Sequence, residues 1–371
     1  MSTENDQTYP YSHVFVGTEK TVAICGSTLF VLDSLSGNLL ASTAITSSDK
    51  NASSHVRVAG VDGMFSHLVT SGDDKRLRVW NVEKLEELSS REIPKRANVL
   101  KLSKDGQTIL AADKFGDIFC YPLTPKETKS VPTTQPSDNT AATSKSISVA
   151  MHDNPEGTLV LGHVSIVTAF ILTPDEKLIV SADRDEHVRV SWYPDGWDVE
   201  KYCMGHKKFI SALEIPTSVP QILISGGGDP ELYIWDYRAG KLLTRIPVWE
   251  KVRPFLKVRG GRRKWKDNGE GKRPPKNKKG KGKQENEQAA ETPEAMDTTP
   301  DKPELASAAF DEEVLVISHI AYARFGSSDV VLFSAVGASA LFYFEWPSSL
   351  DFAEVDLRYV DLLNPVIEYE V

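Results

Sequence analysis

The sequence predicts an all-β fold built from repeated four-stranded units, and two observations support this prediction. A chain of 371 residues has the length of six or seven units of about 45 residues each. Three segments also align around a turn and the strand that follows it: Ser71-GDDKRLRVWN, Ser181-ADRDEHVRVSW and Ser225-GGGDPELYIWD. In the first and the last, an aspartate precedes a tryptophan by six residues, and the residues between them alternate as in a strand.

A Gly-His pair precedes two of these segments, at Gly162-His163 and Gly205-His206. Gly-His followed by a strand, a turn and a strand ending in Trp-Asp is the signature of a WD repeat, one blade of a β-propeller. We expect the histidine, the serine, the turn aspartate and the tryptophan of a blade to share a buried hydrogen-bond network. The predicted network residues are His163, Ser181, Asp185, His206, Ser225, Asp229, Trp235, Asp74 and Trp80. In the middle segment, Ser191 stands where a tryptophan is expected, so Trp192 is predicted to substitute for it.

Weaker copies of the same pattern occupy most of the remaining chain. Together with the three aligned segments, they give six candidate blades, near 12–45, 55–92, 96–122, 159–200, 206–248 and 314–347. The tail from 350 to 371 holds only about two strands. We therefore predict a single propeller domain over 1–371 with seven blades, of which six are clear and the last is incomplete.

Two stretches do not fit the blade pattern. Residues 123–148 are rich in Thr, Ser, Pro and Lys and are predicted to form a flexible loop. Residues 258–309 are predicted to be a disordered insertion, first basic and then acidic. Residues 257–283 alone carry a charge of +11, although the whole chain carries −9. The cations from 262 onward are candidates for RNA binding or nuclear import, unless the insert is merely solvated: Arg262, Arg263, Lys264, Lys266, Lys272, Arg273, Lys276, Lys278, Lys279, Lys281 and Lys283.

No catalytic constellation is found along the sequence. There is no Gly-x-Ser-x-Gly, no His-Glu-x-x-His and no Cys-x-x-Cys pair among the three cysteines. We therefore expect neither an enzyme nor a metal site, and no cofactor of its own. The longest charge-free run, 330–344, is shorter than a membrane span, and the polar N-terminus is no signal peptide, so the expectation is a soluble intracellular protein.

The turn within Ser181-ADRDEHVRVSW carries more charge than a blade requires. A structural aspartate accounts for Asp185 but for none of Arg184, Glu186, His187 and Arg189. Such a turn lies at a rim of the propeller, where these side chains are expected to be exposed. The sequence therefore leaves two interpretations open: a docking point for an acidic partner surface, or an ordinary charged turn.

Residues 161–213 closely resemble the WD-repeat subunit of the eukaryotic tRNA (guanine-N7)-methyltransferase. The resemblance depends on the Ala-Asp-Arg-Asp-Glu-x-Val-Arg-Val-Ser turn and the Cys-x-Gly-His that follows. Flanking segments resemble the family too, so that about 67–245 are covered. His187 departs from the family, in which a lysine is usual, and this change would weaken that contact and make it depend on pH.

The resemblance implies a seven-bladed propeller without a catalytic centre. It implies a heterodimer with a separate catalytic subunit, which binds S-adenosylmethionine and methylates guanosine 46 of tRNA in the nucleus. Arg184, Asp185, Glu186, His187 and Arg189 match the motif that contacts that subunit, and tRNA would be bound directly or through it. The alternative is a generic WD-repeat scaffold, such as a chromatin or ubiquitin-ligase adaptor, without a role in tRNA modification.

Overall fold

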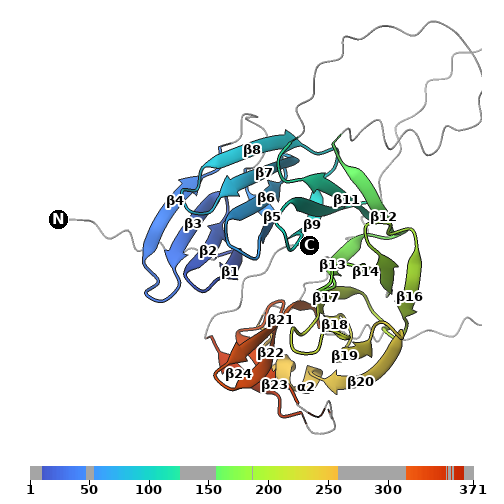
Figure 1. Cartoon of the computed structure of the whole chain (residues 1–371). Coiled ribbons are helices and arrows are strands. Elements are labelled where there is room, and N and C mark those ends of the chain that lie inside the picture. Colours follow the sequence, from blue (N-terminus) through green and yellow to red (C-terminus); the bar gives the residue numbers. More distant parts are fainter. Residues whose placement is uncertain are drawn as a thin grey trace, which may run out of the picture. The chain divides into compact units, whose positions relative to one another are not determined.

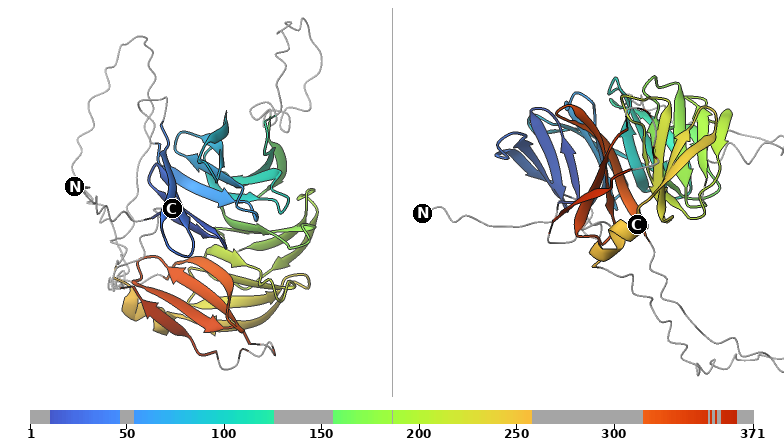
Figure 2. Two further views of the ribbon diagram at one scale, coloured as in Figure 1. Left: turned by 60° about the vertical axis from the view of Figure 1, so that its left-hand side comes forward. Right: turned by 90° about the horizontal axis from the view of Figure 1, so that it is seen from below.

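The computed structural model describes residues 11–46, 54–125, 156–185, 187–257, 315–347, 349, 352 and 355–362. Within these residues, 24 strands form six antiparallel sheets of four strands each, which follow one another in chain order (Figures 1 and 2). The predicted all-β propeller of WD repeats is confirmed, with six blades in the part of the chain that is described. The expected seventh blade is not found there.

Each blade consists of four strands that are consecutive in the sequence. Blades 1 to 3 comprise β1 (His13–Val16), β2 (Lys20–Cys25), β3 (Thr28–Asp33) and β4 (Leu39–Ala44); β5 (Val56–Val61), β6 (His67–Gly72), β7 (Arg76–Asn81) and β8 (Glu87–Glu92); β9 (Ala97–Leu102), β10 (Thr108–Asp113), β11 (Asp117–Pro122) and β12 (Thr158–Gly162). Blades 4 to 6 comprise β13 (Val167–Leu172), β14 (Leu178–Asp183), β15 (Val188–Trp192) and β16 (Val199–Cys203); β17 (Ile210–Glu214), β18 (Ile222–Gly227), β19 (Glu231–Asp236) and β20 (Lys241–Pro247); β21 (Ile317–Phe325), β22 (Ser328–Ala335), β23 (Ala340–Glu345) and β24 (Arg358–Asp361). Two short helices, α2 (Trp249–Val252) and η1 (Arg253–Phe255), follow β20.

Two predicted blade boundaries were wrong. The strand at 158–162 does not open blade 4; as β12 it pairs with β11 and completes blade 3. Residues 123–157 separate these two strands in the sequence, and the local repeat pattern therefore did not indicate their pairing. The tail contributes a single described strand, β24, which pairs with β23 as the outer strand of blade 6 instead of starting a seventh blade.

Burial explains the composition of the strands. The second strands β14 and β18 are buried along their whole length, because neighbouring blades cover both faces of the sheet. The outer strand β20 instead alternates between exposed and half-buried residues over most of its length. Continuous apolar runs therefore mark the middle of a blade, and alternation marks its outer edge.

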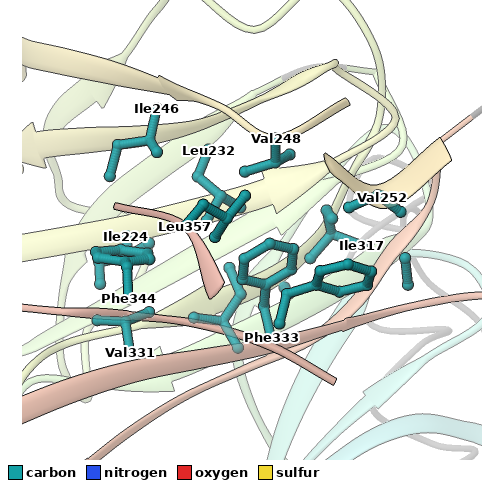
Figure 3. Packing of buried hydrophobic residues seen from close by; sticks show 14 of the residues in the cluster. Ile224, Leu232, Ile246, Val248, Val252, Ile317, Val331, Phe333, Phe344 and Leu357 are labelled. Atoms are coloured by element: carbon teal, nitrogen blue, oxygen red, sulfur yellow. The ribbon is translucent and has the colours of Figure 1, made fainter. Parts of the chain in front are cut away.

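Each pair of successive blades shares a hydrophobic core. Between blades 4 and 5, for example, Val190 packs in one cluster with Tyr233 and Trp235. The largest cluster joins blades 5 and 6 and includes Leu232 and Phe333 (Figure 3). Because every such core is made by two blades, each blade depends on its neighbour for stability.

The inner strand of each blade begins at one rim, which we call the first rim; the opposite edge is the second rim. Val56 pairs with Gly72, and Ile210 with Gly227, so the turn between the second and third strands lies at the first rim too. The hydroxyl of Thr168 donates a hydrogen bond to the carbonyl of Ile210, which ties the starts of inner strands β13 and β17 together. The first rim therefore carries the β14–β15 turn, where a docking point is predicted.

Residues 126–148 of the predicted flexible loop, the whole 258–309 insertion and the basic residues from Arg262 to Lys283 lie outside the described residues. No helix in the described part of the chain is long and apolar enough to cross a membrane.

Candidate functional site

Blade 5 contains a buried chain of hydrogen bonds at the first rim. Trp235 Nε1 donates to Ser225 Oγ over 2.8 Å, and Ser225 Oγ lies 2.7 Å from His206 Nε2. His206 Nδ1 lies 2.8 Å from Asp229 Oδ2, so Nδ1 carries the proton and Nε2 accepts one. Burial lowers the pKa of His206, although Asp229 opposes this shift, and the ring is neutral at pH 7. Because every polar atom of the ring has a structural partner, His206 has no atom free for chemistry.

In blade 4, Asp183 takes the place that the sequence assigned to Asp185. His163 Nδ1 lies 2.9 Å from Asp183 Oδ2, and its Nε2 lies 2.8 Å from Ser181 Oγ. Asp183 Oδ1 also accepts the backbone N–H groups of Asp185 and His187. Burial raises the pKa of Asp183, but the hydrogen bonds from His163 and the backbone outweigh it and hold the pKa below its ordinary value.

The prediction for Asp185 was wrong because the carboxylate can come from two positions in the turn. In blade 5 it comes four residues after the serine, at Asp229, whereas in blade 4 it comes two residues after, at Asp183. A side chain at the blade 5 equivalent, Gly227, is impossible, since its Cβ would lie 2.0 Å from the carbonyl oxygen of Phe209. Counting back from the tryptophan therefore identified the wrong residue in blade 4.

Trp192 does not substitute for the missing tryptophan. Ile179 pairs with Ser191, as Leu223 pairs with Trp235, so Ser191 occupies the anchor position and is completely buried. Trp192 is 42% exposed, and its Nε1 donates to Glu200 Oε2 over 3.0 Å. A small side chain at this anchor is a feature of blade 4.

Blade 2 has a different network again. Trp80 Nε1 donates to Thr70 Oγ1 over 2.9 Å. Asp74 Oδ2 lies 2.5 Å from Arg78 Nη2, and both side chains are buried. Arg78 on β7 is thus the partner of Asp74 in the preceding turn, in the role that a histidine has in blades 4 and 5.

The charged corner at 184–187 lies on the surface of the first rim. The side chains of Arg184, Asp185 and His187 are 65%, 58% and 44% exposed. Arg184 Nε lies 3.8 Å from Asp185 Oδ1, and such an exposed pair adds little to stability. Both groups are free to contact another surface, while Glu186 lies outside the described residues.

Arg189 was predicted to be an exposed docking residue, and the prediction of its exposure was wrong. It is half-buried, its Nη1 donates to the carbonyl of Gly162 over 3.0 Å, and its Nε and Nη2 are buried without a hydrogen-bond partner. Burial lowers the pKa of Arg189, with Tyr202 and Asp183 opposing this shift. The residue ties β12 of blade 3 to blade 4, so the structure gives it a positioning role beside the corner.

Two exposed apolar residues, which were not predicted as site residues, lie in loops at the same rim as the corner. Phe115 lies in the β10–β11 turn, and Val164 lies in the link between β12 and β13. The available signal was a large apolar residue inside an otherwise charged turn, as in Asp113-Lys-Phe-Gly.

Ionisable groups also lie on the inner strands. Burial raises the pKa of Glu214 on β17 to about 7, although Lys101 on β9 opposes the shift. Desolvation lowers the pKa of Lys101, with the negative charge of Glu214 opposing that shift in turn. Within the described residues no group of three or more His, Cys, Asp or Glu side chains could hold a metal ion.

We expect Glu214→Gln to stabilise the protein at pH 8 by about 1–3 kcal/mol. The pKa of Glu214 is higher in the folded than in the unfolded protein. Protonated Glu214 therefore stabilises the fold fully below about pH 4.5, and this stabilisation is lost as the pH rises through 7. Thermal unfolding of the wild type and the variant between pH 5 and pH 8 would measure the difference. Glu83→Gln, at an exposed position, is the control. A difference between Glu214→Gln and the wild type that did not grow with pH would contradict the assignment.

Known proteins share both the sequence pattern and the fold. The family model of the tRNA methyltransferase TRM82 WD40 domain matches residues 42–156 and 148–350. The tRNA (guanine-N(7)-)-methyltransferase non-catalytic subunit trm82 of Aspergillus oryzae is 34% identical over 216 residues, which are 49% of this chain and 44% of that protein. The protein of the same name from Sclerotinia sclerotiorum is 37% identical over 220 residues, which are 50% of this chain and 43% of that one.

The chain thus matches less than half the length of these curated relatives. Among solved structures, a chain in the crystal structure of the mitotic checkpoint complex has a TM-score of 0.58 and 10% identity, with 95% of this chain and 80% of that chain covered. This likeness shows the fold alone. The family model, by contrast, covers residues 42–350, which include blades 2 to 5 and most of blade 6, and the chain therefore belongs to the TRM82 WD40 domain family.

Proposed function

We propose that this chain is a non-catalytic subunit of a tRNA (guanine-N7)-methyltransferase, which binds and stabilises a separate catalytic subunit. The observation that carries the proposal is the family match over most of the propeller, together with relatives named as non-catalytic subunits of that enzyme. In this proposal the partner supplies S-adenosylmethionine and the chemistry at guanosine 46, and the complex works in the nucleus.

The architecture of the first rim supports a docking role. Asp183 accepts hydrogen bonds from the backbone amides of Asp185 and His187 and is itself bonded to His163, which fixes the backbone at these two positions of the corner. Arg184 and Asp185 project from this fixed turn with most of their side chains exposed. Backbone that is already hydrogen-bonded at Asp185 and His187 loses little conformational entropy on binding, so the exposed charges of Arg184 and Asp185 can pair with a complementary surface at low cost.

We also propose that the first rim contacts tRNA directly. Asp73 binds Arg57 at 3.0 Å and Arg96 at 2.7 Å, and both guanidinium groups remain about half exposed. Burial raises the pKa of Asp73, but the hydrogen bonds from the two arginines outweigh it and keep the carboxylate ionised. Two cations held by one carboxylate leave a positive surface suited to phosphate.

The complex can be tested by co-purification with a candidate catalytic subunit and a methylation assay on tRNA. We expect the two chains to purify together, and Arg184→Glu to weaken their association at least tenfold, because it reverses the charge of an exposed side chain in the corner. Arg184 is preferable to Arg189, whose half-buried side chain would confound docking with folding.

Arg238→Glu is the matched control. Arg238 is 51% exposed and pairs with Asp175 at 3.1 Å, as Arg184 pairs with Asp185, but it lies at the second rim. A folded Arg184→Glu variant that bound as tightly as the control would contradict the docking role of the corner. A generic scaffold would instead leave N7-methylguanosine in tRNA unchanged when the chain is deleted.

A further inference from the structure

Phe115 and Val164 are exposed apolar residues at the first rim. Phe115 is 55% exposed, and Val164 is fully exposed. Single exposed apolar residues are common on soluble proteins, and the second rim has its own in Leu35 and Met64. Exposure alone therefore does not distinguish Phe115 and Val164 from other surface residues, but their surroundings do.

The loops that carry Phe115 and Val164 are in backbone contact. The N–H of His163 donates to the carbonyl of Gly116 over 2.9 Å. Gly116 has a φ of +100°, and a Cβ there would lie 2.3 Å from the carbonyl oxygen of Ser165. Only glycine fits such a close approach, so the β10–β11 turn and the β12–β13 link are fixed against each other.

The β12–β13 link is fixed in the same way to the charged corner. The N–H of Arg184 donates to the carbonyl of Ile166 over 3.1 Å, and His163 reaches across to Asp183. Phe115, Val164 and Arg184 thus lie on three successive loops that are hydrogen-bonded to one another. We call the surface of Lys95, Lys114, Phe115, Val164 and Arg184 the apolar–basic patch.

Cations surround the apolar part of this patch. Lys95 Nζ lies 4.3 Å and Lys114 Nζ 5.0 Å from the centre of the Phe115 ring, both within the range of cation–π attraction. Lys95 Nζ also lies 3.8 Å from Asp113 Oδ2, which neutralises part of its charge. Arg184, 3.8 Å from Asp185 Oδ1, lies at the other border, so the patch combines an apolar centre with an edge of three cations and two carboxylates.

We propose that Phe115 and Val164 are the apolar anchors of the docking surface and that the charged corner is one border of it. The occupant is the catalytic subunit, so the inference rests on the proposed function, and the partner surface is an apolar side chain bordered by carboxylates. Well-packed apolar anchors within a polar rim carry most of the affinity of protein interfaces. Because three hydrogen-bonded loops present the anchors, little ordering is needed on binding.

A protein partner suits the patch better than a nucleic acid does. RNA-binding surfaces use aromatic faces on which bases stack. Val164 has no such face, and the Phe115 ring is already in contact with two ammonium groups. Charge complementarity and continuity with the corner both favour an acidic, apolar protein surface.

The test is the affinity between the purified full-length chain and the catalytic subunit, measured by calorimetry. We expect the double substitution Phe115→Ser with Val164→Ser to weaken binding at least 30-fold, and each single substitution to weaken it about fivefold or more. Leu35→Ser with Met64→Ser removes two comparably exposed apolar side chains at the second rim and should change affinity less than threefold. Thermal unfolding of both double variants is expected to match the wild type, because all four side chains are on the surface.

The outcomes separate this inference from the proposed function. If the wild type binds the catalytic subunit and the Phe115/Val164 variant binds equally well, the inference is wrong and the proposed function stands. If the variant keeps its affinity for the catalytic subunit but loses affinity for tRNA, the patch is an RNA surface and the inference is again wrong. If the wild type binds no catalytic subunit, the proposed function fails and the inference with it.

Discussion

Trp235→Ala is expected to lower the free energy of unfolding by about 4 kcal/mol. The side chain is completely buried in the core between blades 4 and 5, where it stacks on Tyr233 with 5.7 Å between ring centroids. Its removal leaves a large cavity and takes a hydrogen-bond donor away from Ser225 Oγ. Thermal or urea unfolding, followed by far-UV circular dichroism and not by tryptophan fluorescence, would measure the loss.

Trp192→Ala is the matched control for this prediction. Trp192 occupies the residue next to the anchor position in blade 4, is 42% exposed and bonds only Glu200 with its indole nitrogen. We expect a change of no more than about 0.5–1 kcal/mol. Equal losses for the two tryptophans would mean that Trp192 anchors blade 4 after all.

Asp183→Ala is expected to cost about 2–4 kcal/mol of stability. The substitution leaves His163 Nδ1 without its acceptor and frees the backbone N–H groups of Asp185 and His187. The pKa of Asp183 is lower in the folded than in the unfolded protein. The ionised carboxylate therefore stabilises the fold at neutral pH, and this stabilisation is lost as the pH falls below about 4. The measurement is the midpoint of thermal unfolding at pH 7.

Asp185→Ala distinguishes this network from the one that sequence spacing suggests. Asp185 is 58% exposed and pairs only loosely with Arg184, so its loss should change stability by less than about 0.5 kcal/mol. The same variant should retain the folded corner, which makes it useful in binding experiments. A larger loss for Asp185→Ala than for Asp183→Ala would reverse the assignment.

The repeat spacing was sufficient to predict the propeller because a blade is a local structure. Its four strands follow one another with short turns, and the alternation within each strand reflects which side is buried. The predictions failed where distant parts of the chain meet. β11 and β12 pair although residues 123–157 lie between them, and no local pattern indicates this pairing.

In the candidate site, too, local features could be predicted from the sequence, whereas contacts between distant parts of the chain could not. The exposure of Arg184 and Asp185 could be predicted because a turn at a rim faces solvent. The burial of Arg189 could not, since it is caused by the carbonyl of Gly162 at the end of a strand from the preceding blade. Likewise, the grouping of Phe115 with Val164 depends on contacts between loops of different blades.

Both halves of the chain contribute strands to blade 3, because β12 belongs to the second half. Residues 11–125 supply its first three strands, and the half that begins at residue 156 supplies the fourth. Neither half can complete this four-stranded sheet by itself, because the outer edge of β11 has β12 as its partner. A chain without residues 158–162 would therefore leave the edge of β11 unpaired. In the folded protein the two halves are joined at this sheet by the β11–β12 hydrogen bonds as well as by the covalent chain.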